Sequence, residues 1–230
     1  MVAAKGLQVQ SEQSDPDVTT RVGRWLFRHR TALPIPVAIA ILALRSGDGA
    51  PSLMLVGAGV AVTLFGEWIR LWGVHHIGVI SRTRSDRLGP LIASGPFAHL
   101  RNPLYVGNIL LWVGFALSAR LVWLAPVIGI LLGAEYHAIV RWEERLLESR
   151  FGDAYRTYAA RVPRWLPSLN RGKMINRGER GARKDQDFSA ISASSEVESG
   201  FLWRETFFSE RGTLLAIAAG YLLLWIKAHF

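Results

Sequence analysis

The chain contains no cysteine among its 230 residues. It therefore has no disulfide framework, no thiolate nucleophile and no metal site built on cysteine. Residues 1–30 also lack the continuous apolar core that a cleavable signal peptide requires. We interpret them as a polar N-terminal segment. Its last part, 21–30, is expected to form a basic amphipathic helix, lying on an anionic membrane surface or leading, solvated, into the first apolar block.

Acidic residues are the minority among the charged ones, with 18 Asp and Glu against 27 Lys and Arg, and the formal net charge is +9. In a soluble protein this excess would suggest a nucleic-acid partner. Half of the residues are hydrophobic, however, and they are gathered in long blocks. Membrane topology therefore explains the charge better, and we expect no nucleic-acid partner.

Five apolar blocks follow the N-terminal segment, and a helix that crosses a bilayer needs roughly 20 apolar residues. The blocks are Thr31–Leu44, Pro51–Trp72, Leu104–Ser118, Leu121–Val140 and Gly212–Ala228. The third and fourth are separated only by two residues, which predicts a tight helical hairpin. Gly57, Gly59 and Gly66 would allow close helix approach. The blocks predict an all-α, multi-spanning membrane protein with about five transmembrane helices.

The distribution of basic residues predicts the orientation. With a cytoplasmic N-terminus and five crossings, the inner segments 21–30, 70–101 and 141–211 hold 4, 5 and 14 Lys and Arg, and the outer segments hold only 3. Cytoplasmic loops carry the excess of basic residues in membrane proteins. We therefore expect the N-terminus and the polar clusters at 82–102 and 141–165 to be cytoplasmic, in an integral membrane protein of a bacterial inner membrane.

Composition divides the chain into four parts. The polar segment 1–30 is followed by a membrane core at 31–169. Residues 170–200 are rich in Gly, Ser and charge, and such a composition predicts a mobile linker. Residues 201–230 are expected to form an aromatic interfacial segment and a last transmembrane helix.

Two polar clusters are expected to meet at the cytoplasmic base of the hairpin. Pro103 is well placed in the first turn of a helix, and Asn102 before it suits an N-cap. Arg101 then lies at the mouth of that helix, where an anion can bind. Glu143 and Glu144 follow the returning helix, so Arg101 and Glu143 should be near neighbours. From spacing alone, the glutamates could equally form weak exposed pairs with neighbouring arginines.

Other polar residues carry less specific signals. Glu67 and Arg70, three apart at the inner end of the second block, could pair with each other or line a cavity. His75 and His76 are adjacent, and adjacent histidines rarely converge on one ion without further ligands. We therefore expect no metal site.

The order of short motifs resembles a known family. The motifs are Gly95-Pro96-Phe97, Arg101-Asn102-Pro103-Leu104-Tyr105-Val106-Gly107, a helical hairpin, Glu143-Glu144, Phe151-Gly152-Asp153-Ala154-Tyr155 and Val162-Pro163-Arg164. This ordered set is similar to the integral-membrane methyltransferases of the isoprenylcysteine carboxyl methyltransferase and phospholipid methyltransferase type. The resemblance covers roughly residues 50–168.

The resemblance implies an S-adenosylmethionine pocket on the cytoplasmic side. By position, the cofactor-binding residues would be Leu91, Ile92, Phe97, Arg101, Asn102, Pro103, Leu104, Tyr105 and Glu143. The catalytic residues would be Arg101, Glu143 and Glu144. Asn102 replaces the frequent His of the family, and Phe97 replaces a frequent Tyr. Ile139 lies near the position of the substrate-handling arginine of the isoprenylcysteine enzymes, so a prenylated-cysteine carboxylate is not the expected substrate.

The expected activity is S-adenosylmethionine-dependent methyl transfer to a lipid-soluble or amphipathic acceptor that enters from the bilayer. The acceptor atom could belong to a carboxylate, an amine or a thiol. Two alternatives remain at this point. Sterol-type membrane reductases, which use NADPH, look broadly similar in this region, and a non-catalytic membrane protein could keep the same fold.

Overall fold

The computed structural model describes residues 18–30, 32, 34–45, 52–78, 91–167 and 203–229. Within these ranges the regular elements are all helical, in agreement with the predicted all-α class. They are α1 (Val18–His29), α2 (Pro34–Ala43), α3 (Leu53–Ile77), the 3-10 helix η2 (Gly95–Ala98), α4 (Pro103–Ser118), α5 (Leu124–Phe151), α6 (Asp153–Arg161) and α8 (Trp203–His229). The predicted linker at 170–200 lies outside the described residues.

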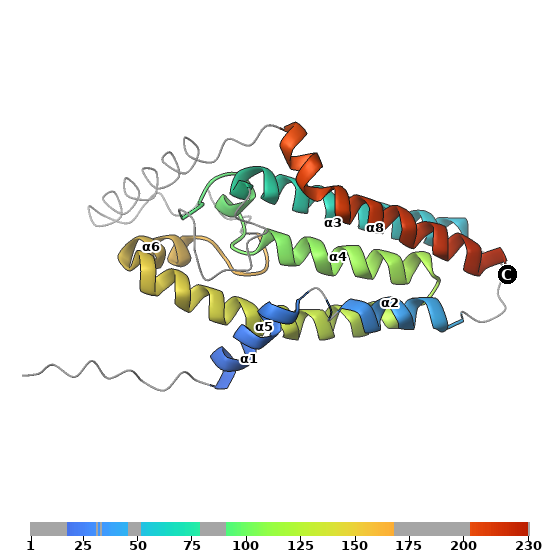
Figure 1. Cartoon of the computed structure of the whole chain (residues 1–230), viewed down its shortest axis with the longest axis horizontal. Coiled ribbons are helices and arrows are strands. Elements are labelled where there is room, and N and C mark those ends of the chain that lie inside the picture. Colours follow the sequence, from blue (N-terminus) through green and yellow to red (C-terminus); the bar gives the residue numbers. More distant parts are fainter. Residues whose placement is uncertain are drawn as a thin grey trace, which may run out of the picture.

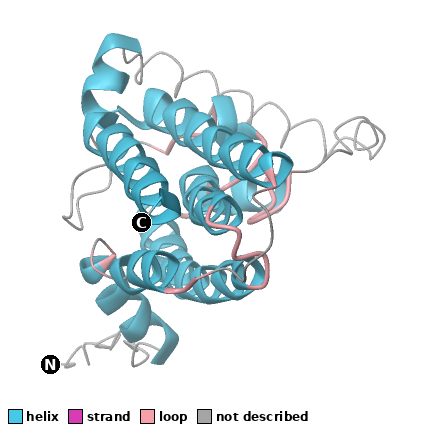
Figure 2. Cartoon of the chain, turned by 90° about the vertical axis from the view of Figure 1, so that its right-hand side faces the viewer, coloured by secondary structure: helices cyan, strands magenta, loops and turns pink. Residues whose placement is uncertain are grey.

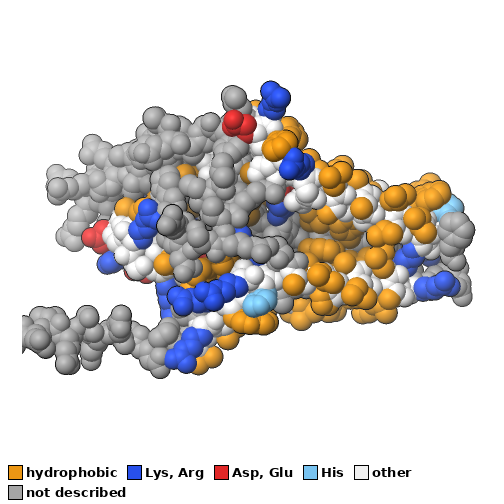
Figure 3. Space-filling model, viewed as in Figure 1, with side chains coloured by type: hydrophobic (Ala, Val, Ile, Leu, Met, Phe, Trp, Pro, Cys, Tyr) orange, Lys and Arg blue, Asp and Glu red, His pale blue; other side chains and the backbone are white. Residues whose placement is uncertain are grey.

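Three of these helices, α3, α5 and α8, are long and apolar enough to cross a membrane. Residues Arg21–His29 and Pro34–Ala43 form a pair bent by 58°, which would make a fourth span if it crosses as one unit. Helix α4 is apolar but has only 16 residues. The chain is thus a helical membrane protein with three or four candidate spans. Hydrophobic side chains cover much of its visible long side (Figure 3).

Helices α3, α4, α5 and α8 run along the long axis of the molecule, whereas α1 lies obliquely against α5 and α6 lies at one end (Figure 1). Seen along that axis, the helices form a bundle (Figure 2).

Helices α3 and α4 approach closely because glycines face each other. A Cβ atom at Gly66 would lie 2.7 Å from the carbonyl oxygen of Gly107. Gly59 has a similar neighbour in Ser118, but Gly57 faces open space, so its predicted packing role is wrong.

The predicted hairpin is confirmed, with α4 and α5 joined by a short turn in which Arg120 has a φ of 63°. Helix α5 then continues without a break from the apolar block through Glu143 and Glu144 to Phe151. It ends at Gly152, whose φ of 52° suits glycine, and α6 begins at the next residue. The glutamates are therefore held by a rigid helix, which fixes their positions relative to α4.

The main hydrophobic core lies between α4 and α5. Its buried side chains include Leu111, Phe115, Ile128, Leu132 and Ile139. Helix α1 is fastened to α5 by the rings of Phe27 and Trp142, whose centroids are 4.8 Å apart. This packing leaves the polar ends of α4 and α5 at the same end of the bundle as α6.

Candidate active site

The start of α4 is tied to the extended segment that follows α6. Asn102 is the N-cap residue, and Pro103 occupies the first turn, as predicted. The Asn102 side chain makes no capping hydrogen bond; its Nδ2 donates instead to the carbonyl of Arg164 at 3.1 Å. The backbone N–H of Arg101 donates to the carbonyl of Pro163 at 2.9 Å. These two bonds bring Arg164 beside Arg101.

Glu144 joins both arginines. Its Oε1 accepts a hydrogen bond from Nη1 of Arg101 at 2.8 Å and another from Nε of Arg164 at 3.0 Å. Its Oε2 accepts from Nη2 of Arg164 at 2.5 Å. The carboxylate is only 13% exposed. Such short, charge-assisted and partly bidentate contacts are stronger than exposed surface pairs, so the exposed-pair alternative does not describe Glu144.

Glu143 faces a different partner. The Tyr105 hydroxyl donates to its Oε1 at 2.9 Å. The ring of Tyr105 also packs on the ring of Tyr136, with centroids 4.8 Å apart. The clusters at 101–105 and 143–144 therefore meet as predicted. The ion-pair partner of Arg101 is however Glu144 and not Glu143, because successive residues on a helix point about 100° apart.

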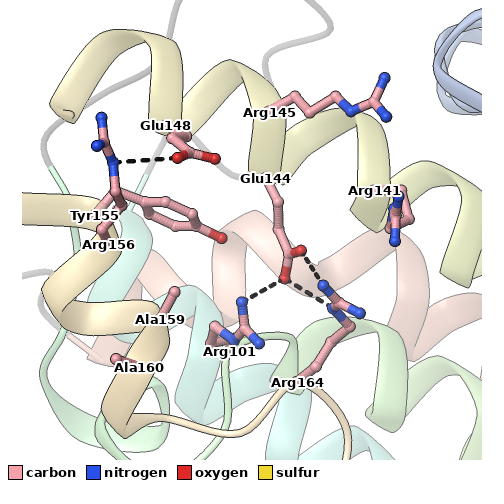
Figure 4. A pocket seen from close by; sticks show the side chains of 10 residues that line it. All are labelled: Arg101, Arg141, Glu144, Arg145, Glu148, Tyr155, Arg156, Ala159, Ala160 and Arg164. Atoms are coloured by element: carbon pink, nitrogen blue, oxygen red, sulfur yellow. Dashed lines mark hydrogen bonds and ion pairs between the residues drawn. The ribbon is translucent and has the colours of Figure 1, made fainter. Parts of the chain in front are cut away.

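A cavity of about 440 Å³ opens beside Glu144. It is lined by Arg101, Arg141, Glu144, Arg145, Glu148, Tyr155, Arg156, Ala159, Ala160 and Arg164. Figure 4 shows Glu144 between Arg101 and Arg164, with the Tyr155 hydroxyl directed toward them. Five arginines face two glutamates here, so the lining is positively charged. The Arg101 Nε is buried and has no hydrogen-bond partner among the described residues, a donor that an anionic ligand group would satisfy.

Burial and charge shift the pKa values of groups from α6 and the following segment. Burial raises the pKa of Tyr155 to about 12, and the negative charge of Glu144 adds to this. Burial likewise raises the pKa of Tyr158 well above its ordinary value. The hydrogen bonds to Glu144 raise the pKa of Arg164. The pocket thus presents guanidinium groups together with the neutral phenol of Tyr155 at physiological pH.

The remaining residues predicted to bind the cofactor do not line this cavity. Leu91 is buried with Tyr155, Tyr158 and Val162, and Ile92 beside it is half-buried. Phe97 is buried, and its carbonyl accepts the Tyr158 hydroxyl at 2.8 Å.

Phe97 and Leu104 both reach toward α3. A Cβ at Gly73 would lie 2.9 Å from Leu104 Cδ2 and 3.8 Å from Phe97 Cζ. They therefore pack between α3 and α4, away from the arginine-lined cavity.

Two cavity residues, Arg164 and Tyr155, received no role from the sequence, although both lie inside motifs of the resemblance. The sequence signal for Arg164 is Pro163, because the residue before a proline favours an extended backbone. Pro163 therefore predicts that α6 ends there and that Arg164 belongs to an extended segment. The direction of that extended segment, back across the start of α4, depends on tertiary contacts and is not encoded by local pattern.

Two further sequence hypotheses concern α3. The predicted pairing of Glu67 with Arg70 is confirmed, with Oε2 and Nε 3.1 Å apart. His75 stacks on Trp203, with ring centroids 4.1 Å apart. In the part of the chain that the structure describes, no group of three or more His, Asp or Glu side chains could hold a metal ion.

Comparison with known proteins finds relatives among bacterial proteins. The chain is 29% identical over 155 residues to a nickel-cobalt-cadmium resistance protein of Alcaligenes xylosoxydans xylosoxydans, covering 64% of this chain and 68% of that protein. It is 29% identical over 163 residues to a cobalt-zinc-cadmium resistance protein of Cupriavidus metallidurans, covering 69% and 67%. It is 43% identical over 56 residues to an uncharacterized protein of Haemophilus influenzae, covering 24% and 79%.

No solved structure matches the chain. Residues 54–154 match the family model described as phospholipid methyltransferase. The matched segment contains α3, α4 and α5, and with them Arg101, Tyr105, Glu143 and Glu144. Over these residues the chain is therefore similar to the phospholipid methyltransferase family, in agreement with the resemblance found in its sequence.

Proposed function

We propose that the protein transfers a methyl group from S-adenosylmethionine to a lipid-soluble or amphipathic acceptor at the membrane. The observation that carries this proposal is the convergence of Arg101, Tyr105, Glu143 and Glu144 at one end of the α4–α5 hairpin. All four lie in the family segment, and two of them, Arg101 and Glu144, line a cavity large enough for a ligand.

The residues present fit this cofactor. Its carboxylate would be held by Arg101, whose buried Nε lacks a partner among the described residues. Its ammonium group or ribose hydroxyls would be held by Glu143. Glu144 would act as a positioning residue, because both of its carboxylate oxygens are engaged by arginines. Leu91, Ile92, Asn102 and Pro103 would form part of the surrounding wall. Phe97 and Leu104, which pack against α3, would support it from behind.

When bound, S-adenosylmethionine supplies a methyl group already activated on a sulfonium. The protein then needs to align the acceptor and exclude water more than to supply acid–base groups. A carboxylate acceptor requires no base, whereas an amine acceptor must lose a proton. For an amine, Glu143 is the group placed to receive that proton. The helix α5 holds it inside the bundle, where Tyr105 fixes its orientation.

The membrane arrangement belongs to the same proposal. The core at 31–169 would carry the activity, with the pocket and N-terminus on the cytoplasmic side of a bacterial inner membrane and the acceptor entering from the bilayer. The basic residues of α1 and of the pocket support this orientation, since basic residues favour the cytoplasmic side. Figure 3 shows Lys and Arg side chains around α1, toward the end of the molecule that carries α6.

The test is to measure, by calorimetry, the binding of S-adenosylmethionine and S-adenosylhomocysteine to detergent-purified protein. NADPH, the ligand of the alternative function, is measured separately as a control. We expect micromolar binding of the first two, at least tenfold weaker in Glu143→Gln. Glu148→Gln is the matched control, because Glu148 lines the same cavity but is half exposed and pairs with Arg156. Binding of NADPH alone would contradict the proposal and favour a reductase.

A further inference from the structure

Helix α8 lies outside the family segment, yet it contributes to the interior of the bundle. It runs along α3 (Figure 1). Most of its apolar side chains face outward, including Leu215, Leu222 and Trp225. Its two buried residues are polar, Thr206 and Glu210. A buried carboxylate in a candidate membrane span is costly unless it is paired, and such residues are functional candidates by default.

Glu210 is paired with Arg70 of α3. Its Oε2 accepts a hydrogen bond from Arg70 Nη2 at 2.8 Å and another from the Thr213 hydroxyl at 2.8 Å. Glu67 binds the same guanidinium through Nε at 3.1 Å. The exposed fractions are 14% for Arg70 and 4% for each glutamate. Two carboxylates from two helices therefore fix the plane of one guanidinium.

A continuous series of side-chain contacts leads from this guanidinium to the candidate site. Arg70 Nη1 donates to Oδ1 of Asn108 on α4. The side chain of Asn108 in turn lies close to the hydroxyl of Tyr136 on α5. The ring of Tyr136 packs against that of Tyr105, which holds Glu143. Each contact joins two different helices, so a displacement at one end is passed through the α3–α4–α5 interfaces.

We propose that Glu210 is a positioning residue for the candidate site, acting through Arg70, Asn108 and Tyr136 on the Tyr105–Glu143 pair. Among the described residues, removing its charge leaves Glu67, on the same helix, as the one carboxylate paired with Arg70, and the guanidinium turns toward that partner. Asn108 then loses its fixed donor, Tyr136 loses its fixed contact, and the Tyr105 hydroxyl is no longer held on Glu143. Helix α8 thereby supports a candidate site whose own residues belong to other parts of the chain.

A double-mutant cycle tests this coupling. We expect Glu210→Gln to weaken S-adenosylhomocysteine binding about fivefold, within the range of coupling between contacting networks. Combined with Tyr105→Phe, it should add little further loss, because both changes release the same group. Losses that simply multiply, or no loss in Glu210→Gln, would overturn the inference. Thr213→Val is the milder second variant if Glu210→Gln does not fold, and the same non-additivity is expected.

Tyr221→Phe is the matched control on α8. Its hydroxyl donates to Thr63 Oγ1 at 2.8 Å and lies 3.2 Å from Ser118 Oγ, so its loss loosens α8 without touching the series from Arg70. Its effect on affinity should multiply with that of Tyr105→Phe. A coupling equal to that of Glu210 would show general loosening of α8 and would contradict a specific role.

The affinity measurement rests on the proposed function, so a readout without ligand is needed. Fluorine NMR of protein labelled with fluorotyrosine reports on the five tyrosines, and the Tyr105 signal is assigned by its loss in Tyr105→Phe. This signal should shift in Glu210→Gln and stay in place in Tyr221→Phe. If it shifts although S-adenosylhomocysteine does not bind, the coupling stands and the proposed function fails. An unmoved signal would refute the coupling itself.

Discussion

Glu144 and Arg164 are joined by two hydrogen bonds, from Nε at 3.0 Å and from Nη2 at 2.5 Å, although they belong to α5 and to the segment after α6. Arg101 adds a third bond to the same carboxylate from the residues before α4. One side chain thus ties three parts of the chain together at the cavity. The geometry of the candidate site depends on this carboxylate.

Replacing Glu144 with Gln should therefore destabilise the protein and disturb the cavity. The amide keeps one acceptor but leaves two guanidinium groups without their counter-charge, and breaking partly buried charged hydrogen bonds costs about 2 kcal/mol. Thermal unfolding in detergent should show a lower midpoint. Glu148→Gln should change it little, since both partners of the Glu148–Arg156 pair are at least half exposed. Equal shifts in the two variants would contradict the role of Glu144.

Asn102→Ala should loosen the segment that carries Arg164. The Asn102 side chain donates to the Arg164 carbonyl, and losing one such bond costs about 1 kcal/mol. This side chain makes no capping hydrogen bond to α4. The effect should therefore appear as faster backbone hydrogen exchange at 162–167, with exchange in α4 unchanged. Faster exchange in the first turn of α4 instead would show that the residue acts as a cap.

Much of the fold follows from local pattern. The apolar blocks and the two-residue break at Ala119 and Arg120 were sufficient to predict helices and a hairpin. The hairpin then requires that Arg101 and the pair Glu143 and Glu144 meet at one end, because an antiparallel pair of similar length returns to its start. The meeting of these clusters is thus a consequence of topology that sequence reasoning can reach.

The partners within the site could not be predicted in the same way. Which glutamate faces Arg101 depends on the rotation of α5 about its axis, and this rotation is set by packing against α1 and α4. Arg164 reaches the site because two backbone-directed bonds hold its segment across α4. The Arg70–Glu210 pair joins residues 140 positions apart, and no local signal specifies such a contact.

Close packing of α3 on α4 predicts opposite effects at two glycines of the same helix. An alanine Cβ at Gly66 would lie 2.7 Å from the Gly107 carbonyl oxygen and 2.9 Å from the Leu111 nitrogen, both backbone atoms that cannot move aside. Gly66→Ala should therefore lower stability by about 1–3 kcal/mol. Gly57→Ala meets no atom within 4 Å and should raise it by about 0.5–1 kcal/mol through helix propensity. Thermal unfolding of both variants in the same detergent measures the difference, and destabilisation by both would contradict it.

Tyr155 makes stability depend on alkaline pH. Its pKa is about 12 in the folded protein, raised first by burial and then by Glu144, against about 10 in an unfolded chain. Below pH 10 the phenol is neutral in both states and has no effect on the pH dependence. Between about pH 10 and 12 only the unfolded chain releases the proton, so the free energy of unfolding falls as pH rises. Tyr155→Phe should remove this part of the slope in unfolding measurements from pH 8 to 12. A slope unchanged in that variant would show that Tyr155 ionises normally and is not buried beside Glu144.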